Sequence, residues 1–373
     1  SGRERREDEK SACKAATQLV WFVSLSAVAI MILVYFGKDI ILNQVFGHIT
    51  AEVKGHADIY LLIVTASIPF IALYNGGAAI FRAMGNSQVS MRVSLLMNAI
   101  NVTGNAILVF GLRIGTAGVA IPTLISRMVA AIVITVLLCN QTRILHIERT
   151  LKIRFDGRMI RKILAIGVPN GLENSMFQLG KILVLSLVST FGTYAIAANA
   201  VSNAIALFQI LPGMAISLAI TTVISQCVGA NDYEQVHYYL KKLLAIIYVA
   251  MVGTVALIFL ALPLILKAYN LSDQTAAAAT NIIHFHGISA MIIWPLSFAL
   301  PAAYRAAGDA KACMYTSIVS MWIFRIGFSY LVGKYMGLGV FGVWVAMVID
   351  WVVRAICFII RYFNGKWKHG AIV

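Results

Sequence analysis

Long apolar runs alternate with short polar connections along most of the chain. The connections carry glycine and charged or polar residues, as in GLRIGTAG at 111–118 and KYMGLG at 334–339. A helix of about 20 apolar residues crosses the hydrocarbon core of a bilayer. The pattern therefore predicts ten membrane-spanning helices, over residues 15–36, 59–81, 90–110, 117–138, 160–188, 195–227, 239–267, 276–303, 312–333 and 340–362.

One connection differs from the others in length and charge. The segment NQTRILHIERTLKIRFDGRMIRK at 140–162 is long and basic, and part of it is suited to lie on the lipid surface as an amphipathic helix. We predict that it joins two helix bundles. The expected domains are an N-terminal bundle of four helices at 1–139, a cytoplasmic basic linker at 140–159 and a C-terminal bundle of six helices at 160–373.

Composition places the chain among polytopic all-α membrane proteins. Of its 373 residues, 60% are hydrophobic and only 12% are charged, with a mean hydropathy of +0.84. Soluble domains carry about 25% charged residues, so this chain has too little charge to form an ordinary water-exposed surface.

The net charge of +15 comes mostly from the connections between helices, which argues against a nucleic-acid surface. On one side lie 21 basic residues, and on the other only five: Lys38, Lys54, Arg113, Lys267 and Lys334. Cytoplasmic loops of membrane proteins are enriched in Lys and Arg. We therefore predict that the richer side, with both observed termini, faces the cytoplasm and that the protein lies in the plasma (cytoplasmic) membrane.

Cysteine and histidine give no sign of a metal centre or a disulfide framework. The five cysteines are scattered and form no C-x-x-C pair, which indicates free thiols. His284 and His286 are two residues apart and point in divergent directions on a helix, which disfavours a metal pair.

A short phrase occurs twice, as FRAMGNSQ at 81–88 and YRAAGDAK at 304–311. Its alanine, arginine and glycine positions match at an offset of 223 residues, and after a one-residue gap Gly118-Val119 matches Gly342-Val343. Internal repeats of this kind are typical of secondary transporters. We predict two halves related by an axis along the membrane normal, with Arg82 and Arg305 as equivalent cytoplasmic anchors.

The two predicted halves are unequal. The second has six helices and the first has four, so the opening pair of the second half lacks a counterpart. We therefore expect two further helices upstream of Ser1, and a 6 + 6 arrangement in a longer parent protein.

Several phrases resemble those of the multidrug and toxic-compound extrusion (MATE) transporters. They are GVPNGLENSMFQLGK at 167–181, FGTYAIAANAVSN at 191–203, both Arg-Ala-x-Gly turns, and GVFGVWVAMVIDWVVRA at 339–355, in family order. The resemblance implies a V-shaped pair of six-helix bundles around a central cavity. It also implies export of amphiphilic, often cationic, compounds by alternating access, driven by inward flow of H⁺ or Na⁺. Where this chain has Asn105, the family pattern often has an acid.

Only two acidic residues lie well inside predicted helices, Glu173 and Asp350. An ionisable group costs about 2.5–3.5 kcal/mol at the centre of a bilayer, so it is retained where it faces a bundle interior or a cavity. Glu173 flanks a polar stripe with helical spacing, formed by Asn170, Asn174, Gln178 and Lys181. A carboxylate there could exchange a proton, bind Na⁺ or attract a cationic substrate. The alternative is a structural pair with Lys181 or with a neighbouring helix.

Asp350 and four further charged or helix-bending residues lie within the spans. Asp350 and Arg354 have the i,i+4 spacing of an intrahelical ion pair, which predicts a structural role. Pro169 precedes the polar stripe and is expected to bend its helix. Arg127 and Arg325 are expected to extend toward an interface, without a role in transport.

Asparagines form two more polar stripes. Asn98 and Asn105 lie on the third predicted helix, with Asn101 between them, and Asn199 and Asn203 lie on the sixth. Polar residues in membrane helices often form hydrogen bonds between helices. Both this structural role and the lining of a substrate or cation pathway remain open for them.

The resulting expectation is a monomeric efflux antiporter for amphiphilic or cationic drugs or metabolites, with the lipid bilayer as its surroundings. Its only expected cofactor is the coupling ion, H⁺ or Na⁺. One alternative is a flippase of the same superfamily that moves lipid-linked saccharides, which would favour a strongly cationic cavity. A membrane enzyme such as a prenyl transferase is the other alternative, but no acid cluster for Mg²⁺ and pyrophosphate ends any predicted helix.

Overall fold

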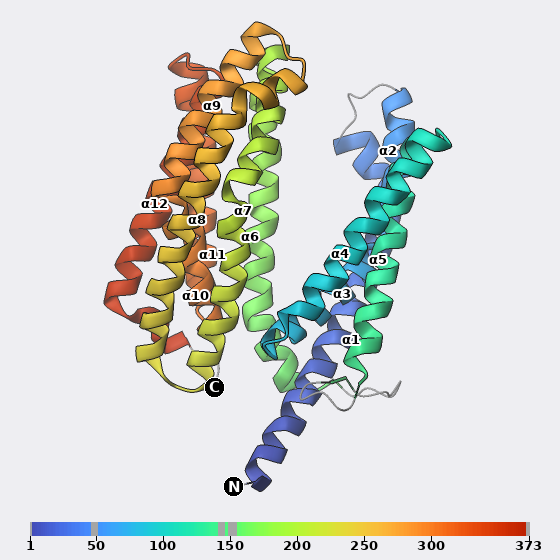
Figure 1. The fold of residues 1–373 in the computed structure, drawn as a ribbon, viewed down its shortest axis with the longest axis vertical. Helices are drawn as coiled ribbons and strands as arrows, with labels where there is room; N and C mark the ends of the chain where they lie inside the picture. Colours follow the sequence, from blue (N-terminus) through green and yellow to red (C-terminus); the bar gives the residue numbers. More distant parts are fainter. Residues whose placement is uncertain (1, 46–50, 141–145, 148–154, 371–373) are drawn as a thin grey trace. The chain divides into compact units, whose positions relative to one another are not determined.

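The computed structural model describes residues 2–45, 51–140, 146–147 and 155–370 (Figure 1). Every regular element within these ranges is a helix, which confirms the predicted all-α membrane fold. The chain divides into two compact units, Ser1–Ile163 and Leu164–Val373. Most of the predicted linker at 140–159 lies outside the described residues.

The first unit contains five α-helices and two short π-helical stretches among its described residues. In chain order they are α1 (Gly2–Ile40), η1 (Ile41–Val45), α2 (Ala51–Ala66), α3 (Ile68–Ala83), α4 (Ser87–Asn105), η2 (Ala106–Gly111) and α5 (Thr116–Leu138). Its core forms where α1, α3 and α5 meet around the fully buried Phe81 and Ile134.

The second unit begins within α6 and holds the rest of the chain (Figure 1). Its elements are α6 (Gly157–Ser189), α7 (Thr193–Gly229), α8 (Tyr233–Ala268), α9 (Asp273–Ile292), η3 (Pro295–Ala299), α10 (Leu300–Ala306), α11 (Ala310–Ser320), η4 (Met321–Gly327), η5 (Ser329–Tyr335), α12 (Val340–Asn364) and η6 (Lys366–Gly370).

Seven helices of the described chain are long and apolar enough to cross a membrane, or up to nine if each of two bent pairs forms one span. The remaining predicted span, 160–188, coincides with α6. This helix has 33 residues, which is ample length for a bilayer, but its polar residues make it less apolar than the others. The sequence pattern therefore identified α6 as a span by its length and place between connections more than by its hydropathy.

Both bent pairs have a proline next to the break. The axes of α2 and α3 differ by 42°, with Pro69 in the first turn of α3. The axes of α9 and α10 differ by 60°, and Pro295 begins the π-helical stretch between them. Proline lacks a backbone N–H and clashes with the preceding turn, so it bends a helix at a defined place. Each bend comes one helix before an Arg-Ala-x-Gly turn.

The two Arg-Ala-x-Gly turns have the same backbone geometry. Gly85 has φ +81° and Gly308 has φ +90°, a region that favours glycine because it lacks a Cβ. The Gly85 N–H donates to the Arg82 carbonyl at 2.9 Å, and the Gly308 N–H donates to the Arg305 carbonyl at 3.0 Å. In both turns the next N–H donates to the carbonyl five residues back, which ends the helix.

The later part of the repeat is equally close. Gly115 (φ +78°) and Gly339 (φ +64°) precede α5 and α12. Gly118 donates to the Gly115 carbonyl at 3.0 Å, and Gly342 donates to the Gly339 carbonyl at 3.1 Å. The matched glycines and hydrogen bonds confirm that the sequence repeat is also a repeat of local structure, with one copy in each unit.

The first turn of α6 is tied to α1. The Asp156 carboxylate accepts from the backbone N–H of Arg158 at 3.0 Å and lies 3.4 Å from the Lys14 ammonium. These contacts, led by the Arg158 N–H, lower the pKa of Asp156. The Asp156 N–H in turn donates to the Gln18 side chain at 3.2 Å. The end of the long connection is thus anchored by short-range polar contacts.

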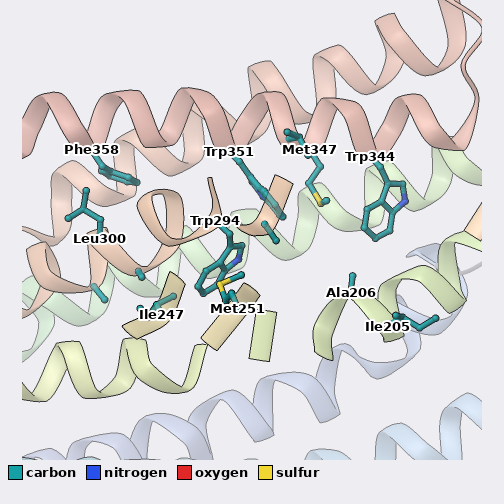
Figure 2. Packing of buried hydrophobic residues seen from close by; sticks show 14 of the residues in the cluster. Ile205, Ala206, Ile247, Met251, Trp294, Leu300, Trp344, Met347, Trp351 and Phe358 are labelled. Carbon is teal, nitrogen blue, oxygen red and sulfur yellow. The ribbon is translucent and has the colours of Figure 1, made fainter. Parts of the chain in front are cut away.

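Large apolar side chains from α12 form the centre of the second unit. Figure 2 shows Trp344, Met347, Trp351 and Phe358 projecting from one face of α12 toward Trp294 and the neighbouring helices. Their spacings of three, four and seven residues place them on one side of a helix. This apolar wall fixes α12, and with it the charged residues on the same helix.

Candidate functional site

A cavity of about 900 Å³ lies within the second unit. Its walls come from α6, α7, α9, α10, α11, η4 and α12. The charged and strongly polar residues in its lining are Asn170, Glu173, Asn174, Lys181, Asn199, Asn203, His286, Arg305, Arg325 and Arg354. Ligand sites are typically apolar pockets with a few placed polar groups, and this cavity has that character.

The α6 face of the cavity largely follows the predicted stripe. Asn170, Glu173, Asn174 and Lys181 line the cavity, whereas Gln178 is exposed and is absent from the lining. At about 100° per residue, Gln178 lies about 60° beyond Lys181 around the helix. Phe177 lies between Glu173 and Lys181 on the same face and completes it. The stripe of polar residues therefore predicted the correct face of α6, but Gln178 lies outside the cavity lining.

Glu173 pairs with an arginine from another helix. Its Oε1 lies 2.7 Å from Arg305 Nη2, and the two side chains are 11% and 24% exposed. Glu173 Oε2 and Arg305 Nε are both buried without a hydrogen-bond partner in the described part of the protein. Of the two structural alternatives, the pair with a neighbouring helix is the one formed, and the pair with Lys181 is not. Arg305, which was predicted as an anchor only, connects the end of α10 to α6.

Two other cations meet at the Phe177 ring. Lys181 Nζ lies 4.7 Å and Arg325 Cζ lies 5.1 Å from the ring centroid. Such cation–π contacts stabilise a cation by about 0.5–2 kcal/mol. The Nη1 of Arg325 approaches the Met321 sulfur at 3.9 Å, a weak acceptor, and its Nε is buried without a partner among the described residues. The expectation that Arg325 extends to an interface is wrong, since it lies in the cavity wall.

Asp350 and Arg354 form a buried ion pair at 3.0 Å, with side chains 0% and 3% exposed. The Ser320 hydroxyl donates to the same carboxylate oxygen, and Arg354 also donates to the Ser317 carbonyl at 3.3 Å. These bonds join α11 to α12. Arg354 lines the cavity as well, so the pair combines a structural contact with a charged wall position.

The α7 asparagines and the histidine of α9 have different surroundings. Asn199 accepts a hydrogen bond from the Trp344 indole at 3.0 Å, and Asn203 lines the cavity. His286 Nδ1 lies 2.6 Å from the Gln209 side-chain oxygen, whereas the His284 ring packs on Phe259. The two histidines thus diverge. Across the described residues, no group of three or more His, Cys, Asp or Glu is arranged to hold a metal ion.

The remaining predicted residues lie elsewhere. Asn98 is exposed on α4 of the first unit, and Asn105 donates to Asn101 at 3.3 Å on the same helix. Neither belongs to the cavity lining of the second unit. Pro169 is buried within α6, one residue before Asn170, and α6 continues through it.

The sequence held a signal for Arg325, whose place in the cavity wall was missed. Four cations lie inside predicted spans away from every connection: Arg127, Lys181, Arg325 and Arg354. The three in the second unit all line the cavity. Arg127 instead donates to Ser67 at 2.7 Å, at the break between α2 and α3. Burial of a cation in a membrane helix was thus a stronger indicator than the general rule that arginine extends to an interface.

The fold and the cavity define a multi-pass membrane protein with a polar pocket among its helices. The MatE family model matches residues 6–107 and 169–331, so the chain belongs to the MatE family. This confirms the resemblance to MATE transporters that the sequence phrases carried.

Known relatives and solved structures agree with this assignment. The chain is 22% identical to the "Probable multidrug resistance protein NorM" of Thermotoga maritima, over 96% of this chain and 78% of the relative. It is 28% identical to the "Uncharacterized transporter YisQ" of Bacillus subtilis, over 93% of this chain and 76% of that protein. An outward-facing multidrug resistance MATE family transporter of the MOP superfamily has a similar fold, with a TM-score of 0.88 and 21% identity over 98% of this chain and 82% of that one.

Proposed function

We propose that this protein is a secondary active efflux transporter for small amphiphilic drugs or metabolites, coupled to the inward flow of H⁺ or Na⁺. The observation that carries the proposal is the cavity of about 900 Å³, lined by charged, amide and aromatic side chains on helices of a MatE-family chain. A volume of this size admits a drug-sized molecule. Export by alternating access, and organic cations as one substrate class, follow from the family resemblance and belong to the same proposal.

Glu173 is the proposed site of ion coupling. Protonation removes the charge of a carboxylate and with it the ion pair to Arg305, whereas Na⁺ competes with Arg305 for the same oxygens. Either event releases α6 from the end of α10, since the contact of 2.7 Å joins these two helices. The Oε2 atom is buried and accepts no hydrogen bond among the described residues, so it has the acceptor capacity to bind the incoming ion.

The proposed surroundings follow from the distribution of charge. We place the protein in the cytoplasmic membrane as a monomer, with both observed termini on the cytoplasmic side, because the basic residues favour that side. Fusion of a reporter that is active only in the cytoplasm to Val373 tests this orientation. An inactive, stably inserted fusion would contradict it.

Transport in proteoliposomes tests the function directly. The purified protein is reconstituted, and movement of fluorescent amphiphiles is followed under a proton gradient alone and under a sodium gradient alone. We expect one of the two gradients to drive uptake against the concentration gradient of the amphiphile. The absence of movement with every probe under both gradients, in vesicles shown to hold folded protein, would overturn the proposal.

A further inference from the structure

The cavity of the second unit carries more positive than negative charge. Four cations line it, Lys181, Arg305, Arg325 and Arg354, whereas Glu173 is the one carboxylate in the lining that the described residues provide. Asp350 stands directly behind Arg354 and contributes a second negative charge to the cluster. The cluster as a whole therefore remains positive.

Both carboxylates already have arginine partners. Glu173 binds Arg305 at 2.7 Å, and Asp350 binds Arg354 at 3.0 Å and also accepts from Ser320. Lys181 and Arg325 form no direct ion pair among the described residues, and Arg325 interacts with the Asp350 charge only at longer range. Opposite charges that pair in this way offer little attraction to a cationic ligand, since each acid is already neutralised.

Lys181 and Arg325 both contact the same aromatic ring. They approach the Phe177 ring to 4.7 Å and 5.1 Å, one from α6 and the other from η4. Like charges held near each other repel, and a buried charge without a counter-charge is costly. The ring offsets part of that cost, but Arg325 Nε still lacks a hydrogen-bond acceptor in the part of the chain that the structure describes. An anion at this place would supply both the missing charge and the missing acceptor.

Much of the remaining lining is apolar and aromatic. Trp294 and Phe298 stack with ring centroids 5.5 Å apart, and Met321 and Met347 add flexible apolar surface. Methionine and aromatic side chains adapt to varied apolar shapes. A ligand that fits both parts has an acidic head and an apolar or aromatic body.

We propose that this cavity binds the acidic group of an amphiphilic substrate, a carboxylate, sulfonate or phosphate monoester, between Lys181 and Arg325. Guanidinium and ammonium groups form charge-assisted hydrogen bonds with such oxygens. This inference rests on the proposed transport function and assigns acidic or zwitterionic amphiphiles as the substrates that this cavity prefers over organic cations. The apolar body of the substrate packs on Trp294, Phe298 and Met321.

Two probes that share one fluorophore and carry opposite charges test the inference. Dansylglycine carries a carboxylate and dansylcadaverine an ammonium on the same fluorophore, and their binding is measured by fluorescence with the purified chain in phosphatidylcholine nanodiscs. We expect dansylglycine to bind on the order of tenfold more tightly. Lys181→Gln and Arg325→Gln should each weaken dansylglycine on the order of tenfold, because a hydrogen bond to a charged group is lost.

Control variants separate loss of charge from loss of folding. Lys181→Arg and Arg325→Lys keep the charge and should retain most of the affinity. Lys267→Gln removes one exposed cation at the end of α8, outside the cavity lining, and should leave binding unchanged. Thermal unfolding of each variant shows whether it is folded.

The outcomes distinguish this inference from the function on which it rests. Equal or tighter binding of dansylcadaverine, no binding of dansylglycine, or unchanged dansylglycine affinity in folded Lys181→Gln and Arg325→Gln would overturn the inference. Gradient-driven transport of dansylcadaverine would meanwhile keep the transport function intact. If phosphatidylglycerol in the nanodiscs abolishes dansylglycine binding, the anion is a lipid phosphate and the assignment to a small substrate is wrong.

Discussion

The two units share a backbone repeat but differ in the chemistry of their interiors. After the one-residue gap the offset is 224 residues, so Asp350 of the second unit corresponds to Ser126 and Arg354 to Ala130. In the first unit, Ser126 donates to a backbone carbonyl. Neutral side chains thus stand where the second unit has charged ones.

The residues that build the shared helix arrangement are therefore different from the charged residues of the cavity. Turn glycines, prolines near the bends and apolar faces occur in both units, and they suffice for the common helix arrangement. Of the four cations inside predicted spans, three lie in the second unit and one, Arg127, lies in the first. Variants at these positions test how far the second unit depends on charged residues where the first unit has neutral ones.

The buried ion pair of the second unit should show the largest effect. Arg354→Ala leaves the fully buried Asp350 without its counter-charge, so we expect a loss of about 3–5 kcal/mol in the free energy of unfolding. The double variant Asp350→Ser with Arg354→Ala introduces the residues that the first unit has at the matched positions. It should recover a substantial part of this loss, because no buried charge is left unpaired. Thermal and denaturant unfolding in detergent measure both. Equal destabilisation of single and double variants would show that packing, and not charge, dominates.

The matched glycines should respond unequally. A Cβ on Gly342 would lie 2.7 Å from the Gly333 Cα, whereas on Gly118 it would lie 3.2 Å from the Leu108 backbone. Rigid backbone cannot move aside cheaply, so Gly342→Ala should cost about 1–3 kcal/mol and Gly118→Ala clearly less. The shift in unfolding temperature of the two variants is the measurement. A larger shift for Gly118→Ala would mean that the first unit is packed more tightly there.

Loss of the Glu173 carboxylate should impair coupling. Glu173→Gln keeps the shape but removes the ion pair with Arg305, and we expect gradient-driven transport in proteoliposomes to fall on the order of tenfold, equivalent to about 1.4 kcal/mol. Asn105→Ala, in the first unit, should have a smaller effect. Asp273→Asn removes an exposed carboxylate at the start of α9 and serves as the charge-matched control. Undiminished transport by Glu173→Gln would assign the residue a purely structural role.

The smallest predicted effect concerns a single hydrogen bond of the cavity wall. Trp344→Phe keeps an aromatic ring but removes the indole N–H that donates to Asn199 at 3.0 Å. We expect a loss of about 0.5–1.5 kcal/mol in stability. In the double variant Trp344→Phe with Asn199→Ala, the second change should cost little more. Additive losses in that cycle would show that the two side chains act independently.

Much of the fold could be read from the sequence. Apolar runs and polar connections fixed the helices, and the Arg-Ala-x-Gly phrases located equivalent turns, because only glycine readily adopts the required positive φ. The periodicity of α6 also identified the face with Asn170, Glu173, Asn174 and Lys181. Local spacing is enough for such conclusions, since residues on one helix face are close in sequence.

Only the tertiary structure decided which charges meet. Glu173 and its partner Arg305 are 132 residues apart, and Lys181 and Arg325 approach the same ring from different helices. Sequence spacing holds no information on contacts between helices, whose rotation depends on the packing of the whole unit, here on the apolar face of α12. The sequence by itself determined a duplicated helical membrane protein with a polar face on α6. Packing determined that this face closes a cavity with an excess of positive charge.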